Sequence, residues 1–331
     1  MIRAVDVGYG AVKGVCESRE VEYPSAVGSF RPIRFATGME NQALKEKLCV
    51  EYEGKRYFIG DMAYKQSTPR VTMSSERFTS QEGLSLLLSA LVLLSNQQFE
   101  EIKLVTGLPV NEYKGLHRKY KDVLTGNNYI KLLEPDGSGS KFYSFDVKEA
   151  YVLPQPVGTI FDQVMNRNGD IEEKQLAGGR IAVLDIGKHT VDLALTDALQ
   201  FVDKSSISFS DIGIFDAYKD LSLELKNNGY DIPADSLEPY IRNGKSFDGL
   251  VELKERVFIA QAEKIISRVY NIWSDLWSFD RIFITGGGAV LLGDYLLQNL
   301  NTEKAVICNK PTFTNTRGFY KMAKRKWDKN G

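Results

Sequence analysis

The chain has 331 residues, of which 43% are hydrophobic and 26% charged, which is the composition of a globular protein long enough for two domains. Its net charge of −1 gives no electrostatic footprint for nucleic acid or a membrane, so we expect it to bind neither directly. The three cysteines, Cys16, Cys49 and Cys308, are too widely spaced for a disulfide framework or a zinc site. Together with an N-terminus that has no signal-peptide pattern, they predict a cytoplasmic protein.

The first half of the chain alternates short strands with helices. The segments "IRAVDVG" and "AVKGVCE" flank a glycine turn, as in a β-hairpin, and "LCVEYEGKRYFIGD" continues the strand pattern. The 11-residue run Leu84–Leu94 is shorter than the roughly 20 apolar residues that cross a bilayer, so it predicts a buried core helix. "EIKLVTGLP" predicts a strand and "NEYKGLHRKYKDVL" a helix. "PDGSGSK" (Pro135–Lys141) predicts a hairpin turn, and "KEAYVLPQPVGTIFDQVMNRN" a short strand, a loop and a helix.

The second half repeats this alternation after "QLAGGR" (Gln175–Arg180), where the opening pattern restarts. "RIAVLDIG", "TVDLALTD" and "LQFVDKSSISFSDIG" predict strands, and helices are expected near Phe215–Leu225 and Leu253–Trp273. "FDRIFITGGGAVLLGDYLLQNL" predicts a strand, a glycine turn and a helix. Strands mixed with helices twice over imply two α/β domains built on one plan.

We expect a first domain over residues 1–160 and a second over residues 161–331. The first is predicted to carry a small inserted lobe at about residues 30–75. The second is predicted to carry one at about residues 229–250, where turn-forming residues are frequent.

One motif occurs twice. "AVDVGYGAVKG" begins at residue 4 and "AVLDIGKHTVDLA" at residue 182, and aligning them places Asp6 on Asp185 and Gly8 on Gly187. A glycine-containing turn lets backbone N–H groups approach phosphate oxygens. A carboxylate at the strand end can hold a hydrated magnesium ion. Two such turns facing each other across a cleft would bind a triphosphate from both sides.

The two copies differ in one charge, because Lys13 in the first corresponds to Asp192 in the second. A lysine at this position can reach a β- or γ-phosphate as a point charge. The alternative is two unrelated hairpins with buried glycines. The matched spacing of the copies favours the phosphate-binding interpretation.

A third glycine turn supports the same interpretation. Gly286, Gly287 and Gly288 follow the apolar strand "RIFIT" and precede a predicted helix, where a backbone without side chains suits close packing against a nucleotide. The turn is not a Walker A loop, because no GKS or GKT follows it, and it lacks the GxGxxG spacing of a Rossmann fingerprint.

In this order and spacing, the three turns resemble the actin, sugar-kinase and heat-shock-chaperone ATPase superfamily. Within it, "DVGYGAVKG", "TGLPV", "VLPQPVG", "VLDIGKHTVDLAL" and "ITGGGAVLLGD" resemble the ParM (StbA) group of prokaryotic actin-like proteins, and most of all its archaeal type known from Thermoplasma. The tail "NTRGFYKMAKR" resembles that group's closing helix. The resemblance implies an α/β actin-like ATPase fold: two related, duplicated ribonuclease H-like domains with a nucleotide cleft between them.

The resemblance also implies roles for particular residues. Asp6 and Asp185 would hold Mg²⁺ through water, beside bound ATP or GTP. The nucleotide would contact three loops. The first phosphate loop consists of Gly8, Tyr9, Gly10, Ala11 and Lys13, and the second of Gly187, Lys188, His189 and Thr190 with the following Asp192. The adenosine turn consists of Gly286, Gly287 and Gly288.

One departure from the family pattern stands in the second loop, where the family usually has another glycine before its threonine. Here Lys188 and His189 follow Gly187. Their side chains either point outward or alter how the loop holds a nucleotide, and the sequence leaves both open.

Gln155 in "YVLPQPVG" stands where the resemblance places the residue that orients the attacking water in actin-like ATPases. A glutamine is no strong base, but its amide can orient water, which favours slow ATP hydrolysis over phosphoryl transfer to a metabolite. A loop glutamine bonded to the backbone is the alternative.

We therefore expect a nucleotide-dependent, polymerising actin-like ATPase. Head-to-tail contacts between copies would form a cytomotive filament that segregates plasmid DNA or positions other cargo, with DNA bound through an adaptor protein. A small-molecule kinase of the same superfamily and a non-polymerising ATP-switched scaffold are the alternatives.

Overall fold

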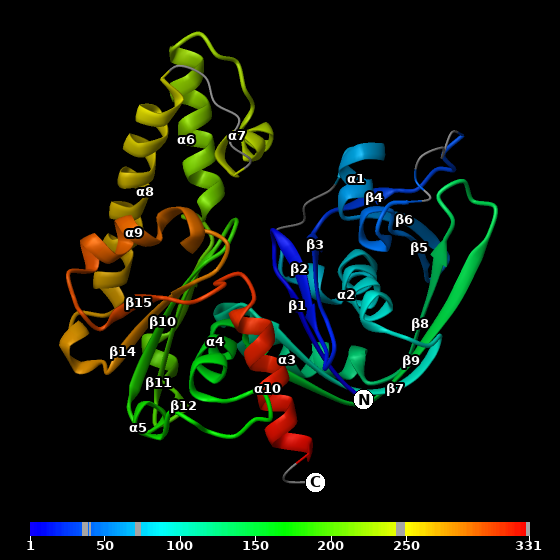
Figure 1. Cartoon of the computed structure of the whole chain (residues 1–331), viewed down its shortest axis with the longest axis horizontal. Helices are drawn as coiled ribbons and strands as arrows, with labels where there is room; N and C mark the ends of the chain where they lie inside the picture. Colours follow the sequence, from blue (N-terminus) through cyan, green and yellow to red (C-terminus); the bar gives the residue numbers. More distant parts are fainter. Residues whose placement is uncertain (35–38, 40, 70–73, 243–248, 329–331) are drawn as a thin grey trace. The chain divides into compact units, whose positions relative to one another are not determined.

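The computed structural model of the chain describes residues 1–34, 39, 41–69, 74–242 and 249–328, and it contains two compact units (Figure 1). The first unit consists of Met1–Glu173 together with the described residues from Asn315 onward, and the second of Lys174–Thr314. Each unit has its own mixed sheet and its own helices, which confirms the predicted α/β class.

The described part of the first unit has a nine-stranded sheet in the order β3-β2-β1-β7-β9-β8-β5-β6-β4. The hairpin of β1 and β2 is the predicted one, and β8 and β9 form the second predicted hairpin. The strands are β1 (Ile2–Val7), β2 (Ala11–Val15), β3 (Glu20–Pro24), β4 (Val27–Ser29), β5 (Cys49–Tyr52), β6 (Lys55–Ile59), β7 (Phe99–Leu108), β8 (Gly126–Leu133) and β9 (Ser140–Pro154).

Five α-helices accompany the described part of this sheet. They are α1 (Asp61–Gln66), α2 (Gln81–Leu94), α3 (Val110–Leu124), α4 (Gln155–Val164) and α10 (Thr314–Asp328), with the 3-10 turns η1 (Leu44–Glu46) and η2 (Ser75–Thr79). The predicted short strand before Gln155 is instead the second half of β9, a 15-residue strand that pairs first with β8 and then mainly with β7.

The second unit has a smaller sheet in the order β12-β11-β10-β14-β15, with β13 also paired to β11. Its strands are β10 (Arg180–Ile186), β11 (Val191–Asp197), β12 (Gln200–Phe201), β13 (Ile207–Phe209), β14 (Arg281–Thr285) and β15 (Ala305–Ile307). Its helices are α5 (Lys174–Ala177), α6 (Ile214–Asn227), α7 (Glu238–Arg242), α8 (Leu250–Ile272) and α9 (Ala289–Leu300), with the 3-10 turns η3 (Asp203–Ser205), η4 (Ala234–Ser236) and η5 (Leu276–Ser278).

The two sheets share one plan. In the first unit β1 pairs antiparallel with β2 and parallel with β7, and β7 pairs parallel with β9. In the second unit β10 pairs antiparallel with β11 and parallel with β14, and β14 pairs parallel with β15. This repeated topology is the internal duplication that the two copies of the motif predicted.

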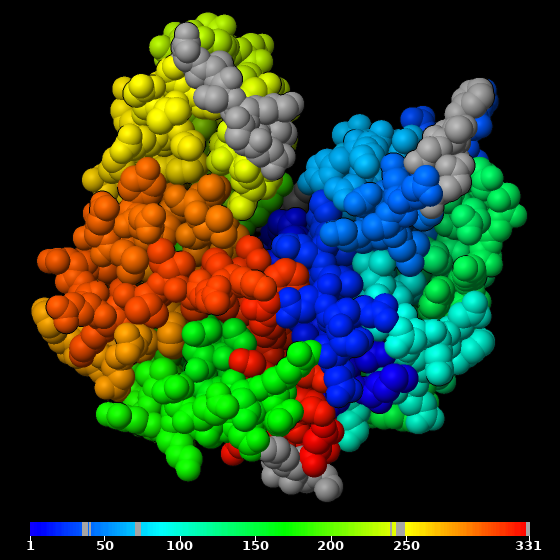
Figure 2. Space-filling model, in the orientation of Figure 1, coloured from blue at the N-terminus to red at the C-terminus, as the bar shows by residue number. Residues whose placement is uncertain are grey.

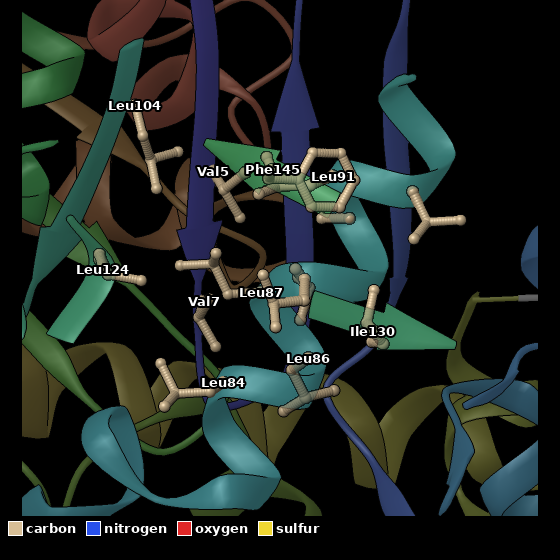
Figure 3. Close-up of a cluster of buried hydrophobic side chains, with 14 of the residues drawn as sticks. Val5, Val7, Leu84, Leu86, Leu87, Leu91, Leu104, Leu124, Ile130 and Phe145 are labelled. Atoms are coloured by element: carbon tan, nitrogen blue, oxygen red, sulfur yellow. The ribbon is translucent and has the colours of Figure 1, made fainter. Parts of the chain in front are cut away.

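The core of the first unit is built around α2, which packs on β1, β2, β5 and β8. Ser80 caps the helix, because its Oγ accepts the N–H of Gly83 at 3.1 Å. Leu86, Leu87 and Leu91 on α2 are buried among apolar side chains of the surrounding strands and of α3 (Figure 3). The apolar run is thus a buried helix, as predicted. Among the described residues, no helix has the length and hydropathy needed to cross a membrane.

The C-terminal helix α10 packs with the first unit, whereas we expected the whole segment 161–331 to form the second domain. Phe319 is fully buried, and its ring lies so close to Gly107 and Gly158 that a Cβ at either glycine would approach it within 3 Å. Arg317 pairs with Glu20 of β3 at 2.6 Å, and Figure 2 shows the helix (red) beside the N-terminal residues (blue). Helical periodicity reveals an apolar face but not which sheet covers it, so the sequence did not reveal this placement.

Parts of both expected lobes lie outside the described residues, namely 35–38, 40 and 70–73 in the first and 243–248 in the second. In the first, β5 pairs with β8, so the strands continue the main sheet of the unit. In the second, η4 and α7 lie between α6 and α8 along the chain.

The packing of α10 predicts a stability effect. Phe319→Ala removes a fully buried ring and should lower the free energy of unfolding by about 3–5 kcal/mol, measured by urea denaturation. Phe99→Ala, at a side chain that is 65% exposed, is the control and should change it by less than about 0.5 kcal/mol. Equal effects of the two substitutions would contradict the packing of α10 on the first unit.

Candidate functional site

The two copies of the motif form the same hairpin. In the first unit the N–H of Gly8 donates to the carbonyl oxygen of Ala11 at 3.1 Å, and in the second the N–H of Gly187 donates to that of Thr190 at 2.8 Å. Asp6 lies opposite Lys13 across the first hairpin, and Asp185 lies opposite Asp192 across the second. The residues of both turns are half-buried, apart from Thr190, which is buried, so the turns reach the surface of their units.

Asp6 is a buried carboxylate with an amide partner. It lies near the end of β1, just before the glycine loop, and is 5% exposed. Its side chain accepts a hydrogen bond from Nε2 of Gln155 at 2.6 Å. Burial raises the pKa of Asp6, since desolvation penalises the charged form. The charge of Lys13 and hydrogen bonds from the side chains of Gln155 and Asn315 lower the pKa, but they offset burial only in part.

The sheet topology explains why Gln155 meets Asp6. Strand β1 runs parallel to β7, and β7 runs parallel to β9, so the carboxyl ends of β1 and β9 lie at the same edge of the sheet. That edge is where ligands bind in α/β sheets. Gln155 begins α4 directly after β9, and Pro156 at the second helical position suits a helix start.

Two further residues complete this cluster, and the sequence analysis missed both. Oγ1 of Thr159, one turn along α4 from Gln155, donates to Oδ1 of Asn315 at 2.8 Å, and Asn315 in turn hydrogen-bonds Asp6. Asn315 stands in the first turn of α10. The only signal for it is the run "TNT" at a helix start, which is as typical of a simple cap as of a functional residue.

A second missed group holds the first glycine loop in place. Arg77 of η2 is 5% exposed, and its Nη2 donates to the carbonyl oxygen of Gly8 at 3.0 Å and to Oγ of Ser25 at 2.7 Å. The N–H of Ser25 donates to the carbonyl oxygen of Gly10 at 3.0 Å. The guanidinium also lies over the ring of Tyr9, 4.5 Å from its centre.

The second hairpin is held by hydroxyl groups instead. Oγ1 of Thr190 donates to Oδ2 of Asp192 at 3.1 Å, and the hydroxyl of Ser208 on β13 donates to Oδ1. Asp192 is 3% exposed, so these contacts make it part of the internal structure of the hairpin. Its predicted direct contact with a nucleotide stays a prediction.

The bulky pair in the second loop rests on α6. Nζ of Lys188 lies 5.3 Å from the centre of the Phe215 ring, and the ring of His189 meets Phe215 edge-on at 5.0 Å. The backbone N–H of Phe215 donates to the carbonyl oxygen of Lys188 at 2.8 Å. A Cβ at Gly213 would lie 2.4 Å from that oxygen, so a glycine permits this close approach. The two side chains thus pack against the start of α6.

The three glycines of the adenosine turn differ in what surrounds them. Gly286 has φ +89°, and a Cβ there would lie 2.2 Å from Oδ1 of Asp185. A Cβ at Gly288 would lie 2.2 Å from Cγ2 of Ile186. Both glycines are therefore required by packing against β10. Among the described residues, a Cβ at Gly287 would have only Nη2 of Arg242 nearby, at 3.9 Å, so Gly287 has the space that a ligand contact needs.

In the part of the chain that the structure describes, no three His, Cys, Asp or Glu side chains gather into a metal-binding group. Two carboxylates stand just before the glycine turns, Asp6 and Asp185, each near the end of a buried strand, and their role as magnesium ligands stays a prediction.

Two family models match the chain. Residues 4–158 match the model described as "Actin like proteins N terminal domain", and residues 183–298 match "Archaeal actin homologue MreB-like, C-terminal". Together the two models cover most of the chain, which therefore belongs to the actin-like proteins, as the motifs indicated. No curated protein sequence matches it significantly.

Solved structures share the fold over the whole chain. A 15-stranded ParM filament from Clostridium botulinum is 24% identical, with a TM-score of 0.79 over 98% of this chain and 99% of that one. Ta0583, an archaeal actin homologue in complex with ADP, is 20% identical, with a TM-score of 0.78 over the same shares. The Alp12 filament structure is 18% identical, with a TM-score of 0.69 over 98% of both chains. At these identities the likeness shows the actin-like fold.

The burial of Asp6 predicts that its negative charge lowers the stability of the fold. Asp6→Asn should raise the free energy of unfolding at neutral pH by about 0.5–2 kcal/mol, because it removes a desolvated charge. The folded state holds the proton of Asp6 more tightly than the unfolded state does, so wild-type stability falls as pH rises from the ordinary value of 3.8 through the raised pKa. The difference between variant and wild type, measured by urea unfolding, should therefore grow over that interval.

Glu100→Gln is the matched control for Asp6→Asn. Glu100 is as deeply buried but pairs with Arg3 at 2.6 Å, so its neutralisation leaves a buried cation unpaired and should destabilise the fold by about 3–5 kcal/mol. Destabilisation by both substitutions would contradict the account of Asp6 as an incompletely compensated charge.

The surroundings of the adenosine-turn glycines predict unequal tolerance. Gly286→Ala should lower the free energy of unfolding by about 1–3 kcal/mol, because alanine is strained at this φ and collides with Asp185. Gly287→Ala should change it by less than about 0.5 kcal/mol. Thermal and urea unfolding of both variants measure this, and a tolerated Gly286→Ala would refute the packing argument.

Proposed function

We propose that this protein is a nucleotide-dependent, polymerising actin-like ATPase. One observation carries the proposal: the buried carboxylate of Asp6, beside a half-exposed glycine loop, accepts a hydrogen bond from the amide of Gln155. A carboxylate, a backbone N–H loop and a water-orienting amide at one sheet edge are the groups that nucleoside triphosphate hydrolysis requires. We propose that the second loop, with Asp185, binds the phosphates of the same nucleotide.

The residues present fit a magnesium nucleotide. Magnesium in such sites is bound by one or two carboxylates, water and the substrate phosphates rather than by a full set of protein ligands. Asp6 and Asp185 would hold the hydrated ion. Gly8, Gly10 and Gly187 are half-buried, so they lie at the surface of their units, and Gly287 has space beside it for a ligand. When bound, the ion would neutralise charge on the phosphate groups. The ADP in the Ta0583 structure supports an adenine nucleotide as the ligand.

The chain's own groups then have distinct tasks. Lys13, across the hairpin from Asp6, supplies a positive charge beside the first loop. Nε2 of Gln155 donates its hydrogen bond to Asp6. The amide oxygen of Gln155 is then the atom that would accept a hydrogen bond from the attacking water. Asn315 also hydrogen-bonds Asp6, and Thr159 donates to Asn315 in turn. Hydrolysis should be slow, because an amide can orient the attacking water but is too weak a base to take a proton from it.

Self-assembly is proposed from the likeness to filament-forming relatives. The ParM from Clostridium botulinum and Alp12 are both described as filaments, and each matches this chain over almost its full length. Head-to-tail contacts between identical subunits build an open filament when the rotation from one subunit to the next does not close into a ring. We propose plasmid or DNA segregation, or the positioning of other cargo, as its task, with an adaptor protein between filament and DNA.

Right-angle light scattering, with phosphate release followed in the same sample, tests this function on purified protein. With magnesium and ATP, scattering should rise above a critical protein concentration and phosphate release should lag behind it, whereas without nucleotide scattering should stay flat. Parallel samples with GTP establish the nucleotide preference. Phosphate release without scattering at any concentration would contradict filament formation and favour an ATP-switched scaffold. Absence of both signals would contradict the proposed function.

Gln155→Ala should separate assembly from hydrolysis. The variant should release phosphate about 100-fold more slowly, because the group that orients water is lost. It should still assemble with ATP, and its filaments should persist longer than those of the wild type. Gln163→Ala, on the same helix and in contact with Asp162 rather than Asp6, is the control and should hydrolyse at the wild-type rate. A wild-type rate in Gln155→Ala would remove Gln155 from the mechanism.

A further inference from the structure

Arg77 is a buried cation that touches the first glycine loop directly. It comes from η2, more than sixty residues beyond the loop in the sequence, and its side chain is almost wholly excluded from solvent. Nη2 bonds both the carbonyl oxygen of Gly8 and Oγ of Ser25, and the guanidinium plane lies over Tyr9. The first glycine loop is therefore held by a buried group that carries a full positive charge at every physiological pH.

No carboxylate within the described ranges forms an ion pair with Arg77, and its partners are a carbonyl oxygen, a hydroxyl and aromatic rings. Arg3 is the instructive contrast. It is equally buried, but it pairs with Glu100 at 2.6 Å. A buried charge without a counter-charge is unfavourable, and burial accordingly lowers the pKa of Arg77. No described carboxylate supplies this counter-charge, and a bound anion beside the loop would do so.

The backbone around Arg77 is fixed in detail. The hydroxyl of Ser80 and its N–H both donate to the carbonyl oxygen of Arg77, at 2.9 and 3.3 Å. A Cβ at Gly83 would lie 1.8 Å from the same oxygen, so a glycine is required in the first turn of α2. The contacts at the start of α2 thus fix the backbone position of Arg77, and the hydrogen bond from Arg77 to Gly8 holds the first glycine loop.

We propose that Arg77 is a positioning residue of the first phosphate loop and that its charge selects ligands by their phosphate groups. This inference rests on the proposed function and deepens it, because it names the part of the nucleotide that the group recognises. The phosphates supply the counter-charge of Arg77 across the loop backbone. The guanidinium, through Gly8, holds the loop N–H groups in position to donate to phosphate oxygens.

Isothermal titration calorimetry with ADP and with adenosine, each in the presence of magnesium, tests the proposal. Arg77→Met keeps much of the aliphatic volume and removes the charge. It should weaken ADP binding by about 10- to 100-fold, while adenosine affinity changes less than about twofold. Arg77→Lys keeps the charge but cannot form the planar contacts, so it should weaken ADP binding by a smaller factor and again leave adenosine unchanged.

Arg3→Met is the matched control, since it removes a buried arginine whose counter-charge is within the protein. It should lower the unfolding temperature without changing the ratio of ADP to adenosine affinity. If Arg77→Met does not fold, Arg77→Lys decides the matter, and wild-type ADP affinity in that variant would overturn the proposal. Equal losses for ADP and adenosine in a folded Arg77 variant would also overturn it. Wild-type protein that binds no ADP would instead refute the proposed function itself.

Discussion

The carboxylate of Asp6 is buried at the end of an apolar strand, where its charge is only partly compensated, and the arrangement of the first unit follows from this constraint. Burial raises its pKa, so neighbouring groups have to hold it ionised and oriented. These groups come from distant segments of the chain. Gln155 opens α4 after β9, and Asn315 opens α10 near the end of the chain. The carboxylate of Asp6 is thus the point at which the sheet, α4 and α10 are linked by hydrogen bonds.

The second unit repeats the hairpin, but different groups surround its aspartate. Asp185 faces another carboxylate, Asp192, instead of a lysine, and the hydroxyls of Thr190 and Ser208 bind Asp192. Its loop is covered by the start of α6 through Phe215, whereas the first loop is braced by Arg77. The duplication therefore preserved the backbone turn and its aspartate while the charges around them diverged. Such divergence is expected if the two loops serve different parts of one ligand.

Local sequence pattern was sufficient to predict the hairpins, the buried helix α2 and the correspondence of Asp6 with Asp185. These features depend on the alternation of apolar residues and on glycine turns, which the sequence displays directly. Sequence pattern was not sufficient for Arg77 or Asn315, because each acts as a single side chain brought to the loop by tertiary packing. The docking of α10 on the first unit was missed for the same reason.

The glycine turn after β14 shows a subtler limit. The sequence shows three successive glycines and predicts one role for all of them, but two are required by contact with β10 and only Gly287 has open space. A glycine that serves packing and a glycine that serves a ligand are identical in the sequence. Only the neighbouring atoms distinguish them.

The stoichiometry of ADP binding, measured by calorimetry with magnesium on the wild type, Gly8→Val and Gly187→Val, tests most directly whether both loops bind one nucleotide. One ADP per chain in the wild type, with binding lost or severely weakened in each variant separately, is the predicted result. Two ADP molecules per chain, or undiminished binding in either folded variant, would show that the two turns do not share a ligand.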